Sequence, residues 1–326
     1  MSTTTKPAKI EISGEQLQES RTLWGDTWRQ FRKHKLAMLA SAVLIAIVLL
    51  VVVGPFLYSG DPEHIDFSFK YSGMTAERPF GADDLGRDLF ARIIQGGRVS
   101  LLIGVTAMAI AMTVGTLVGL LAGYFSWMDN ILMRITDIFL SLPRLPLLLV
   151  ITLLFREPIN SLVADMMSVL PAEMRGNMLA PSEIGIFFMI VSIIGLLGWM
   201  PTARLVRGEV LTVKEREYVL AARSLGASSR SIIFRHILPN VLSPVIVAAT
   251  FSIASAIISE SALSFLGLGF PPDFPTWGRI LFDGQGHVNK SILLVMWPGL
   301  MISLTVLCVN FIGDGLRDAL DPRLRK

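Results

Sequence analysis

The fold class is decided by the stretch Leu36-Ala-Met-Leu-Ala-Ser-Ala-Val-Leu-Ile-Ala-Ile-Val-Leu-Leu-Val-Val-Val-Gly-Pro-Phe-Leu-Tyr58. It holds no charged residue, and about 20 consecutive apolar residues are enough for a helix to cross the hydrocarbon layer of a bilayer. Residues 1–35 are polar and mixed in charge, without the short apolar core and small-residue cleavage site of a signal peptide. The stretch is therefore expected to stay in the protein as a membrane anchor.

Five further stretches qualify or nearly qualify as membrane spans, and 52% of all residues are apolar. We predict an all-α polytopic membrane protein with six transmembrane helices. Pro143 and Pro146 should kink or break the third helix. Gly115, Gly119 and Gly123 in the second favour close helix packing over contact with solute. The five stretches are Val99 to Tyr124, Ile131 to Phe155, Ile184 to Met200, Leu242 to Leu268 and Ile292 to Ile312.

The distribution of lysine and arginine predicts the orientation of these helices, because cytoplasmic loops carry an excess of both. Basic residues gather before the first span, between the fourth and fifth spans, and after the sixth, whereas the first loop on the opposite side is net acidic. We therefore place both termini in the cytoplasm. The basic residues are Lys6, Lys9, Arg21, Arg29, Arg32, Lys33, Lys35, then Arg204, Arg207, Lys214, Arg216, Arg223, Arg230, Arg235, then Arg317, Arg323, Arg325 and Lys326.

The sequence contains no catalytic or metal-binding constellation. The motifs H-E-x-x-H and G-x-S-x-G are absent, the four histidines are not paired at metal-ligand spacing, and Cys308 is the single cysteine. The segment Gly81 to Asp88 has the glycine interval of a phosphate loop but lacks the Lys-Ser/Thr that would hold phosphate and Mg²⁺. We predict no catalytic residue, no metal site, no cofactor bound by this chain, and no ATP bound by it.

The long cytoplasmic loop, residues 201–240, has a helical pattern of its own. Val213 to Ser224 is predicted as a helix, Gly226 breaks it, and Ser228 caps a second helix that runs to Ile237 before Leu238-Pro239 stops it. Isoleucines give this second helix an apolar side, namely Ile232, Ile233 and Ile237. That side fits a docking surface for another protein. Packing on its own bundle or on anionic lipid fits the pattern equally well.

Three motifs in this chain resemble those of a known family. Leu220-Ala-Ala-Arg-Ser-Leu-Gly226, followed by Leu238-Pro239, resembles the EAA motif of ABC-importer permeases, with Leu220 in place of the motif's glutamate. The flanking residues resemble more narrowly the dipeptide/oligopeptide and nickel branch. Gly81-Ala-Asp-Asp-Leu-Gly-Arg-Asp-Leu-Phe-Ala-Arg92 and Ser259-Glu-Ser-Ala-Leu-Ser-Phe-Leu-Gly-Leu-Gly269 resemble segments of the C-type permease of that branch.

The resemblance implies the permease subunit of an ATP-driven importer of di- or oligopeptides in the bacterial cytoplasmic (inner) membrane, with type I importer architecture. It would form half of a channel with a homologous B-type permease, above two ATP-binding subunits that hold ATP and Mg²⁺, and receive solute from an extracytoplasmic binding protein. No nucleic-acid partner is expected, and membrane lipid surrounds the chain. Nickel chelates or another small solute are the alternative cargo. The coupling contact to the ATPase is expected at Ala221, Ala222, Gly226, Ala227, Ile232 and Ile233.

This interpretation divides the chain into segments. Residues 1–35 form a cytoplasmic segment, 36–58 the first span and 59–98 an external loop with the family signature. Residues 99–312 form a five-helix core that includes the coupling loop 201–240 and a long external segment, 156–182. Residues 313–326 form a cytoplasmic tail.

Ionisable residues inside the spans are candidates for the solute pathway, because charges are costly in lipid. We single out Glu260, Arg134 and Asp137. Arg134 and Asp137 lie one helical turn apart and can pair with each other. Glu260 can serve an external gate or bind a peptide amine, or it can simply hydrogen-bond to backbone or to a partner subunit.

Two other classes of protein remain open at this level. An ion-coupled secondary carrier would need coupling-ion sites on broken helices, which only the Pro143 and Pro146 region suggests. A membrane scaffold would bind partners without moving solute.

Overall fold

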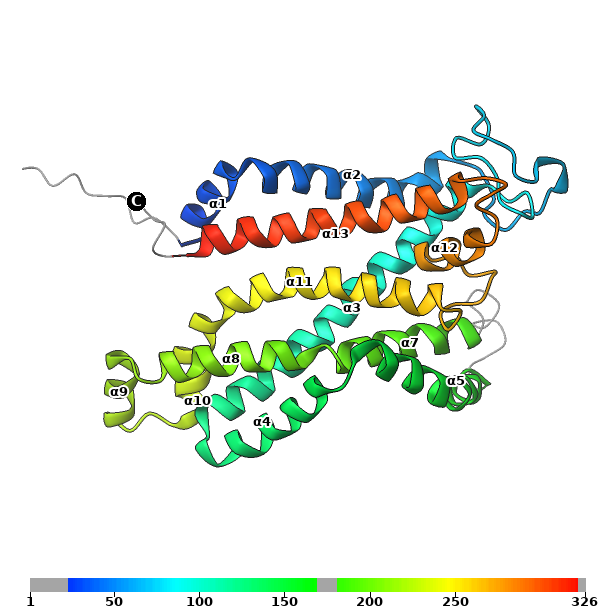
Figure 1. Ribbon diagram of the computed structural model, residues 1–326. Coiled ribbons are helices and arrows are strands. Elements are labelled where there is room, and N and C mark those ends of the chain that lie inside the picture. The colour runs from blue at the N-terminus through cyan, green and yellow to red at the C-terminus, as the bar shows by residue number, and fades with distance from the viewer. Residues whose placement is uncertain (1–22, 169–180, 322–326) are drawn as a thin grey trace, which may run out of the picture.

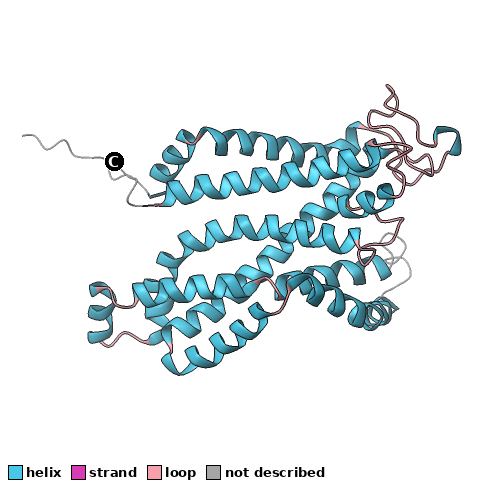
Figure 2. Ribbon diagram, viewed as in Figure 1, coloured by secondary structure: helices cyan, strands magenta, loops and turns pink. Residues whose placement is uncertain are grey.

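The computed structural model describes residues 23–168 and 181–321, and these residues form helices and loops without a β-strand (Figure 2). Six helical segments are long and apolar enough to cross a membrane, which confirms the predicted all-α fold with six spans. They are Lys35–Leu57, Leu89–Tyr124, Arg144–Ser168, Glu183–Val213, Ser229–Phe265 and Leu293–Leu320.

Parts of three predicted segments lie outside the described residues. They are residues 1–22 of the N-terminal segment, 169–180 of the external segment and 322–326 of the tail. Six basic residues used to predict the orientation lie there too: Lys6, Lys9, Arg21, Arg323, Arg325 and Lys326.

The helices form two groups joined by one oblique helix (Figure 1). In the first group α2 (Lys35–Leu57) and α13 (Leu293–Leu320) lie side by side, and α1 (Leu23–Lys33) packs against both. In the second group α5 (Arg144–Ser168) packs on α7 (Pro181–Leu196), which leads into α8 (Trp199–Val213). Between them, α3 (Leu89–Tyr124) contacts α2, α7, α8 and α11 (Leu238–Phe265). The oblique α3 is therefore the axis on which the bundle is assembled.

The two ends of the bundle carry different elements (Figure 1). One end holds α1, the last turns of α13 and the short α9 (Glu217–Ser224). The opposite end holds the loop after α2, the 3-10 turn η1 (Phe67–Phe69) and α12 (Trp277–Gln285). The predicted coupling loop thus shares an end with both described chain ends.

The second span begins ten residues earlier than predicted, at Leu89 rather than Val99. Asp88 caps the helix, because its carboxylate accepts hydrogen bonds from the backbone N–H groups of Phe90 at 2.9 Å and Ala91 at 3.2 Å. A capped first turn satisfies backbone donors that would otherwise lack partners. The apolar pattern alone located the lipid-spanning part and missed this polar extension.

The predicted third span, Ile131 to Phe155, is broken at Pro143 as expected, and the candidate span of the structure begins only after the break, at Arg144. The chain forms α4 (Ser126–Ser141), leaves the helix at Leu142, and starts α5 at Arg144. Pro146 falls in the first turn of α5, where a missing backbone N–H costs little. Because α5 continues to Ser168, residues 156–168 of the predicted external segment belong to this helix.

The predicted helix stop at Leu238-Pro239 is wrong. The chain runs from α10 (Ser229–Ser231) through a π-helical stretch, η2 (Ile232–Ile237), directly into α11. The N–H of Leu238 bonds to the carbonyl of Ile233, five residues back. This wider turn interrupts the regular helical ladder where Pro239 supplies no donor, so the proline is accommodated without ending the helix.

Gly115, Gly119 and Gly123 allow α3 to approach α8 closely. A Cβ atom on these glycines would lie 2.7 Å from that of Thr202 and 2.6 Å from those of Val206 and Val210, respectively. Both helices present these positions four residues apart, so three successive turns interlock. The predicted packing role of the glycines is confirmed.

Candidate functional site

The predicted coupling loop, residues 201–240, protrudes from one end of the bundle at α9 (Figure 1). Helix α8 ends at Val213 and α9 begins only at Glu217, so the predicted helix from Val213 is shorter than expected. Gly226 has a φ of +82°, a value that favours glycine, and it turns the chain after α9. Ser228 caps α10 by accepting the N–H of Ser231 at 3.4 Å, as predicted.

The isoleucines of the loop do not form an exposed surface. Ile232, Ile233 and Ile237 are 1%, 8% and 0% exposed and pack in a cluster that also contains Val206 and Val210. Of the three possibilities for this apolar side, packing on the chain's own bundle is the one that the structure shows. The expectation that Ile232 and Ile233 anchor a partner is therefore corrected: their side chains are already used to hold the loop in place.

Other apolar side chains of the loop are exposed instead. Leu225 is 89% exposed, Phe234 61%, and Leu220 42%. Ala221 and Gly226 are exposed, whereas Ala222 and Ala227 are half-buried. The exposed tip around Leu225 and Gly226 is the part of the loop available to another protein.

Ion pairs brace the same end of the bundle. The Arg207 guanidinium on α8 donates two hydrogen bonds to the Asp129 carboxylate on α4, at 2.5 and 2.6 Å. The hydrogen bond from Arg207 lowers the pKa of the Asp129 carboxyl below its ordinary value. Lys214 donates to the carbonyl of Gly123 at 3.1 Å, which ties the start of the loop to the end of α3.

Asp137 does not pair with Arg134, contrary to the prediction. Its carboxylate bonds to Arg204 of α8 at 2.5 Å, and both side chains are about half exposed (57% and 51%). Arg134 is exposed on α4. The turn-to-turn spacing made the intrahelical pair possible, but the close approach of α8 supplies a different arginine.

Glu260 is fully buried on α11 among hydroxyl groups (0% exposed). It accepts hydrogen bonds from Ser264 at 2.8 Å and from Ser100 of α3 at 3.3 Å, with Ser261 at 3.5 Å. These donors belong to the same chain. The side chain therefore links α11 to α3 in this structure, and its contact with solute or a partner subunit stays a prediction.

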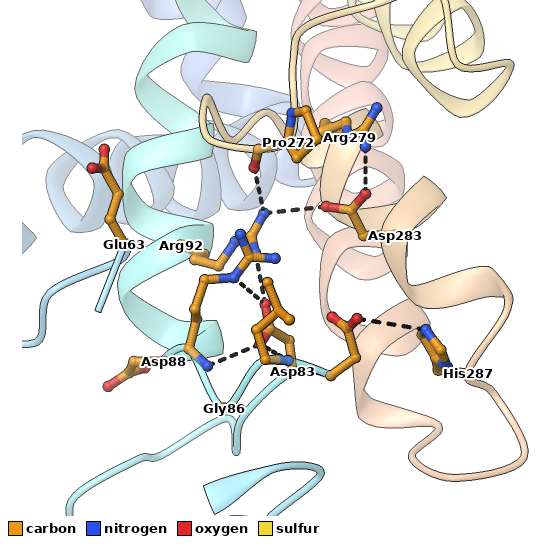
Figure 3. A network of polar contacts seen from close by, with 12 residues as sticks. Glu63, Asp83, Gly86, Asp88, Arg92, Pro272, Arg279, Asp283 and His287 are labelled. Atoms are coloured by element: carbon orange, nitrogen blue, oxygen red, sulfur yellow. Dashed lines mark hydrogen bonds and ion pairs between the residues drawn. The ribbon is translucent and has the colours of Figure 1, made fainter. Parts of the chain in front are cut away.

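A second polar network holds the opposite end of the bundle (Figure 3). The Asp83 carboxylate receives Arg87 Nε at 2.7 Å and Arg92 Nη1 at 2.6 Å. Arg92 also reaches Asp283 of α12 at 3.2 Å, and Asp283 pairs with Arg279 at 2.9 Å.

This network explains the structural role of Gly81 to Arg92, the segment that resembles a motif of the C-type permeases. Its two glycines have φ values of +83° at Gly81 and +76° at Gly86, which bend the loop around Asp83. Burial raises the pKa of the Asp283 carboxyl, and the neighbouring Arg279 and Arg92 oppose that rise. The sequence motif pointed to this segment, but the partners on α12 come from nearly 200 residues further along the chain.

A cavity of about 400 Å³ opens between α4, α5, α8 and α11. Its wall is mostly apolar, with exposed Leu142, Leu205 and Phe251, and it includes the hydroxyl groups of Ser252 and Ser255. Arg144, the first residue of α5, also lines it. Arg144 was not among the predicted site residues, although an arginine between Pro143 and Pro146 in an apolar run was a usable signal.

Comparisons with known proteins agree with the fold of six membrane spans and with the resemblance to ABC-importer permeases. Residues 111–326 match the family described as binding-protein-dependent transport system inner membrane component, and residues 22–73 match the N-terminal TM domain of oligopeptide transport permease C. A dipeptide transport system permease protein of Alkalihalophilus pseudofirmus is 37% identical, over 93% of this chain and 90% of that protein.

Two further relatives align with this chain over similar fractions of their length. An oligopeptide transport system permease protein of Haemophilus influenzae is 36% identical over 94% of this chain and 91% of its own length. A glutathione transport system permease protein of Pectobacterium atrosepticum is 35% identical over 94% and 93%. With six spans and these matches, the chain belongs to the inner-membrane components of binding-protein-dependent transport systems, among the C-type permeases of the dipeptide and oligopeptide branch.

Proposed function

We propose that this chain is the C-type permease of an ATP-driven importer of di- or oligopeptides and that it forms half of the translocation channel. The names of its relatives support peptides as cargo, since they mention transport of dipeptides, oligopeptides and glutathione. The cavity between α4, α5, α8 and α11 supports a pathway through this half. A homologous B-type permease would complete the channel.

The end of the bundle that carries α9 faces the cytoplasm in this proposal. Both described chain ends and the loop with seven basic residues gather there, in keeping with the excess of lysine and arginine in cytoplasmic loops. The opposite end, with the Asp83 network and α12, would face the solute-binding protein. Both termini would then be cytoplasmic.

The observation that carries the coupling proposal is the exposed tip of the loop. Leu225 is 89% exposed, although Val219, Ile232 and Ile237 of the same loop are each 1% exposed or less. An apolar side chain held in the open by a well-packed base is suited to enter a groove on a partner protein. In this chain the partner would be one of two ATP-binding subunits, which bind ATP and Mg²⁺ and carry out hydrolysis.

The buried isoleucines at the base of the loop would allow it to transmit movement to the spans. Ile232, Ile233 and Ile237 join the loop to Val206 and Val210 of α8, and η2 continues without interruption into α11. A displacement of the tip by the closing ATPase pair would therefore be passed to α8 and α11 as rigid elements. Ala221, Ala222 and Ala227 would line the contact as small residues around the tip.

The test is purification of the complete transporter through a tag on this chain, with ATPase assay of the eluate, for wild type and Gly226→Trp. A Cβ atom at Gly226 would meet nothing within 4 Å, so the indole would project into the space that the ATPase is proposed to fill. Wild type should bring down the second permease and an ATP-binding subunit. Gly226→Trp should keep the second permease and lose the ATPase.

Two control variants separate the effect of the bulky indole at the tip from backbone strain and from the general effect of adding a tryptophan. Gly226→Ala carries the same backbone strain at φ +82° without the bulk, so it should retain most of the ATPase. Gly286→Trp, at the opposite end, also meets nothing within 4 Å and should behave as wild type. Wild-type chain that purifies without any ATPase, under detergent that keeps the two permeases together, would contradict the proposal and favour an ion-coupled carrier.

A further inference from the structure

Arg144 is the one charged residue among the described residues that line the cavity between α4, α5, α8 and α11. Its Nη1 donates a hydrogen bond of 2.6 Å to the hydroxyl of Ser255 on α11. Within the described part of the chain, none of the ion pairs involves Arg144. The guanidinium thus has most of its donors available in a cavity with apolar walls.

The position of Ser255 places this charge within the membrane-spanning part of α11. Ser255 lies ten residues before Phe265, the last residue of its span, and at a rise of about 1.5 Å per residue this is about 15 Å from that end. The span continues to Ser229 on the other side, so Ser255 and the guanidinium bonded to it lie inside the span, about 15 Å from its near end. A charge at that depth is costly in lipid and is found where it faces a bundle interior or a water-filled path.

Two further features of the cavity favour a negatively charged ligand at this place. Arg144 is the first residue of α5, so the positive end of that helix lies beside its guanidinium. Ser252 and Ser255 add polar side chains to an otherwise apolar lining. A volume of about 400 Å³ lies within the range of roughly 300–1,000 Å³ that is usual for small-ligand sites.

We propose that Arg144 binds the terminal carboxylate of the peptide as it passes through the membrane. The inference rests on the proposed function, since it concerns the cargo of the same channel. The flat guanidinium matches a carboxylate with two parallel hydrogen bonds, while Ser255 keeps the side chain oriented. Arg144 would therefore select solutes with a free carboxyl end within the permease, independently of the binding protein.

The experiment measures uptake of trialanine and of trialanine amide into proteoliposomes that hold the complete transporter and its binding protein. The variants are Arg144→Gln, Arg144→Lys and, as matched control, Arg156→Gln. Arg156 is on the same helix, about 18 Å further along it, and does not line the cavity. Because the binding protein is identical throughout, a change in the ratio of acid to amide uptake reports on the permease alone.

Arg144→Gln should lower uptake of trialanine roughly ten- to a hundredfold and change uptake of the amide by about twofold or less. Arg144→Lys should fall in between, because it keeps the charge but loses the two-point geometry. Arg156→Gln should match wild type on both peptides. This selective loss would not follow from a merely structural role, which would affect both peptides equally.

Two results would overturn the inference while leaving peptide import intact. One is unchanged trialanine uptake by Arg144→Gln. The other is an equal loss of both peptides accompanied by loss of the second permease on purification, which would assign Arg144 to an ion pair between the two permeases. Failure of the proposed function has a different signature, because wild type would then import neither peptide.

Discussion

Ser100 on α3 and Glu260 on α11 meet inside the bundle, where the Ser100 hydroxyl donates a hydrogen bond of 3.3 Å to the carboxylate. The oxygen of Ser100 in turn accepts the backbone N–H of Trp277 at 3.2 Å. One buried hydroxyl therefore links the second span, the fifth span and the first turn of α12. The end of α11 nearest α12 cannot shift against α3 and α12 without breaking these bonds.

Glu260→Ala should destabilise the protein strongly, by about 3 kcal/mol, because it leaves a cavity and removes the shared acceptor of several buried hydroxyls. Glu260→Gln should cost less, since the amide fills the same volume and keeps one acceptor oxygen. Thermal unfolding of the purified chain in detergent measures both. Glu63→Ala, in the exposed loop after α2, is the matched control and should leave the unfolding temperature unchanged. Equal unfolding temperatures for Glu260→Ala and wild type would contradict the assignment.

Gly119→Ala should destabilise the contact between α3 and α8 by about 1–3 kcal/mol through overpacking. The added Cβ would lie 2.6 Å from that of Val206 and 2.7 Å from the carbonyl oxygen of Ala203, so one helix must move. Gly299→Ala is the control, since the same methyl group on α13 meets nothing within 4 Å. It should be neutral or stabilise by about 0.5–1 kcal/mol through the better helix propensity of alanine. The prediction fails if both variants shift the unfolding temperature in the same direction.

The bond between Arg207 and Asp129 should make stability depend on acid pH. Because the hydrogen bond lowers the pKa of Asp129 in the folded protein, its stabilisation is fully present above the unfolded pKa, which is about 3.9 for aspartate. It is lost as the pH falls through the lower folded pKa. Wild type should therefore unfold at higher temperature than Asp129→Asn at pH 7, and the difference should shrink towards zero in strong acid. A difference that grows on acidification would exclude this linkage.

Asp83→Asn should destabilise the end of the bundle that holds α12 by about 3–5 kcal/mol, because two buried arginines lose the carboxylate that they share. The side chains of Arg87 and Arg92 are 6% and 2% exposed, so water cannot replace the lost partner. Limited proteolysis of the loop between α2 and α3, together with thermal unfolding, measures the effect. Asp61→Asn, in the same loop but exposed, should leave both readouts at the wild-type value. Insensitivity of the Asp83 variant would show that the network does not support this end.

Features of the fold that depend on neighbouring residues or on the membrane were predicted correctly from the sequence. Six spans follow from runs of apolar residues, because hydrocarbon admits few alternatives to a complete helix. The break at Pro143, the turn at Gly226 and the cap at Ser228 each depend on the chemistry of one residue and its neighbours. The same local reasoning failed at Pro239, where a π-helical turn absorbed the missing donor.

The sequence by itself determined the class of fold, the number of spans and the family. Runs of apolar residues and short motifs can be recognised without knowledge of tertiary contacts. Only the tertiary structure decided the partners of the charged and apolar side chains. Asp137 pairs with Arg204 instead of Arg134, Ile232 faces the bundle, and Glu260 is enclosed by hydroxyl groups. Each outcome depends on which helix lies alongside, and helices far apart in sequence meet only through packing of the whole bundle.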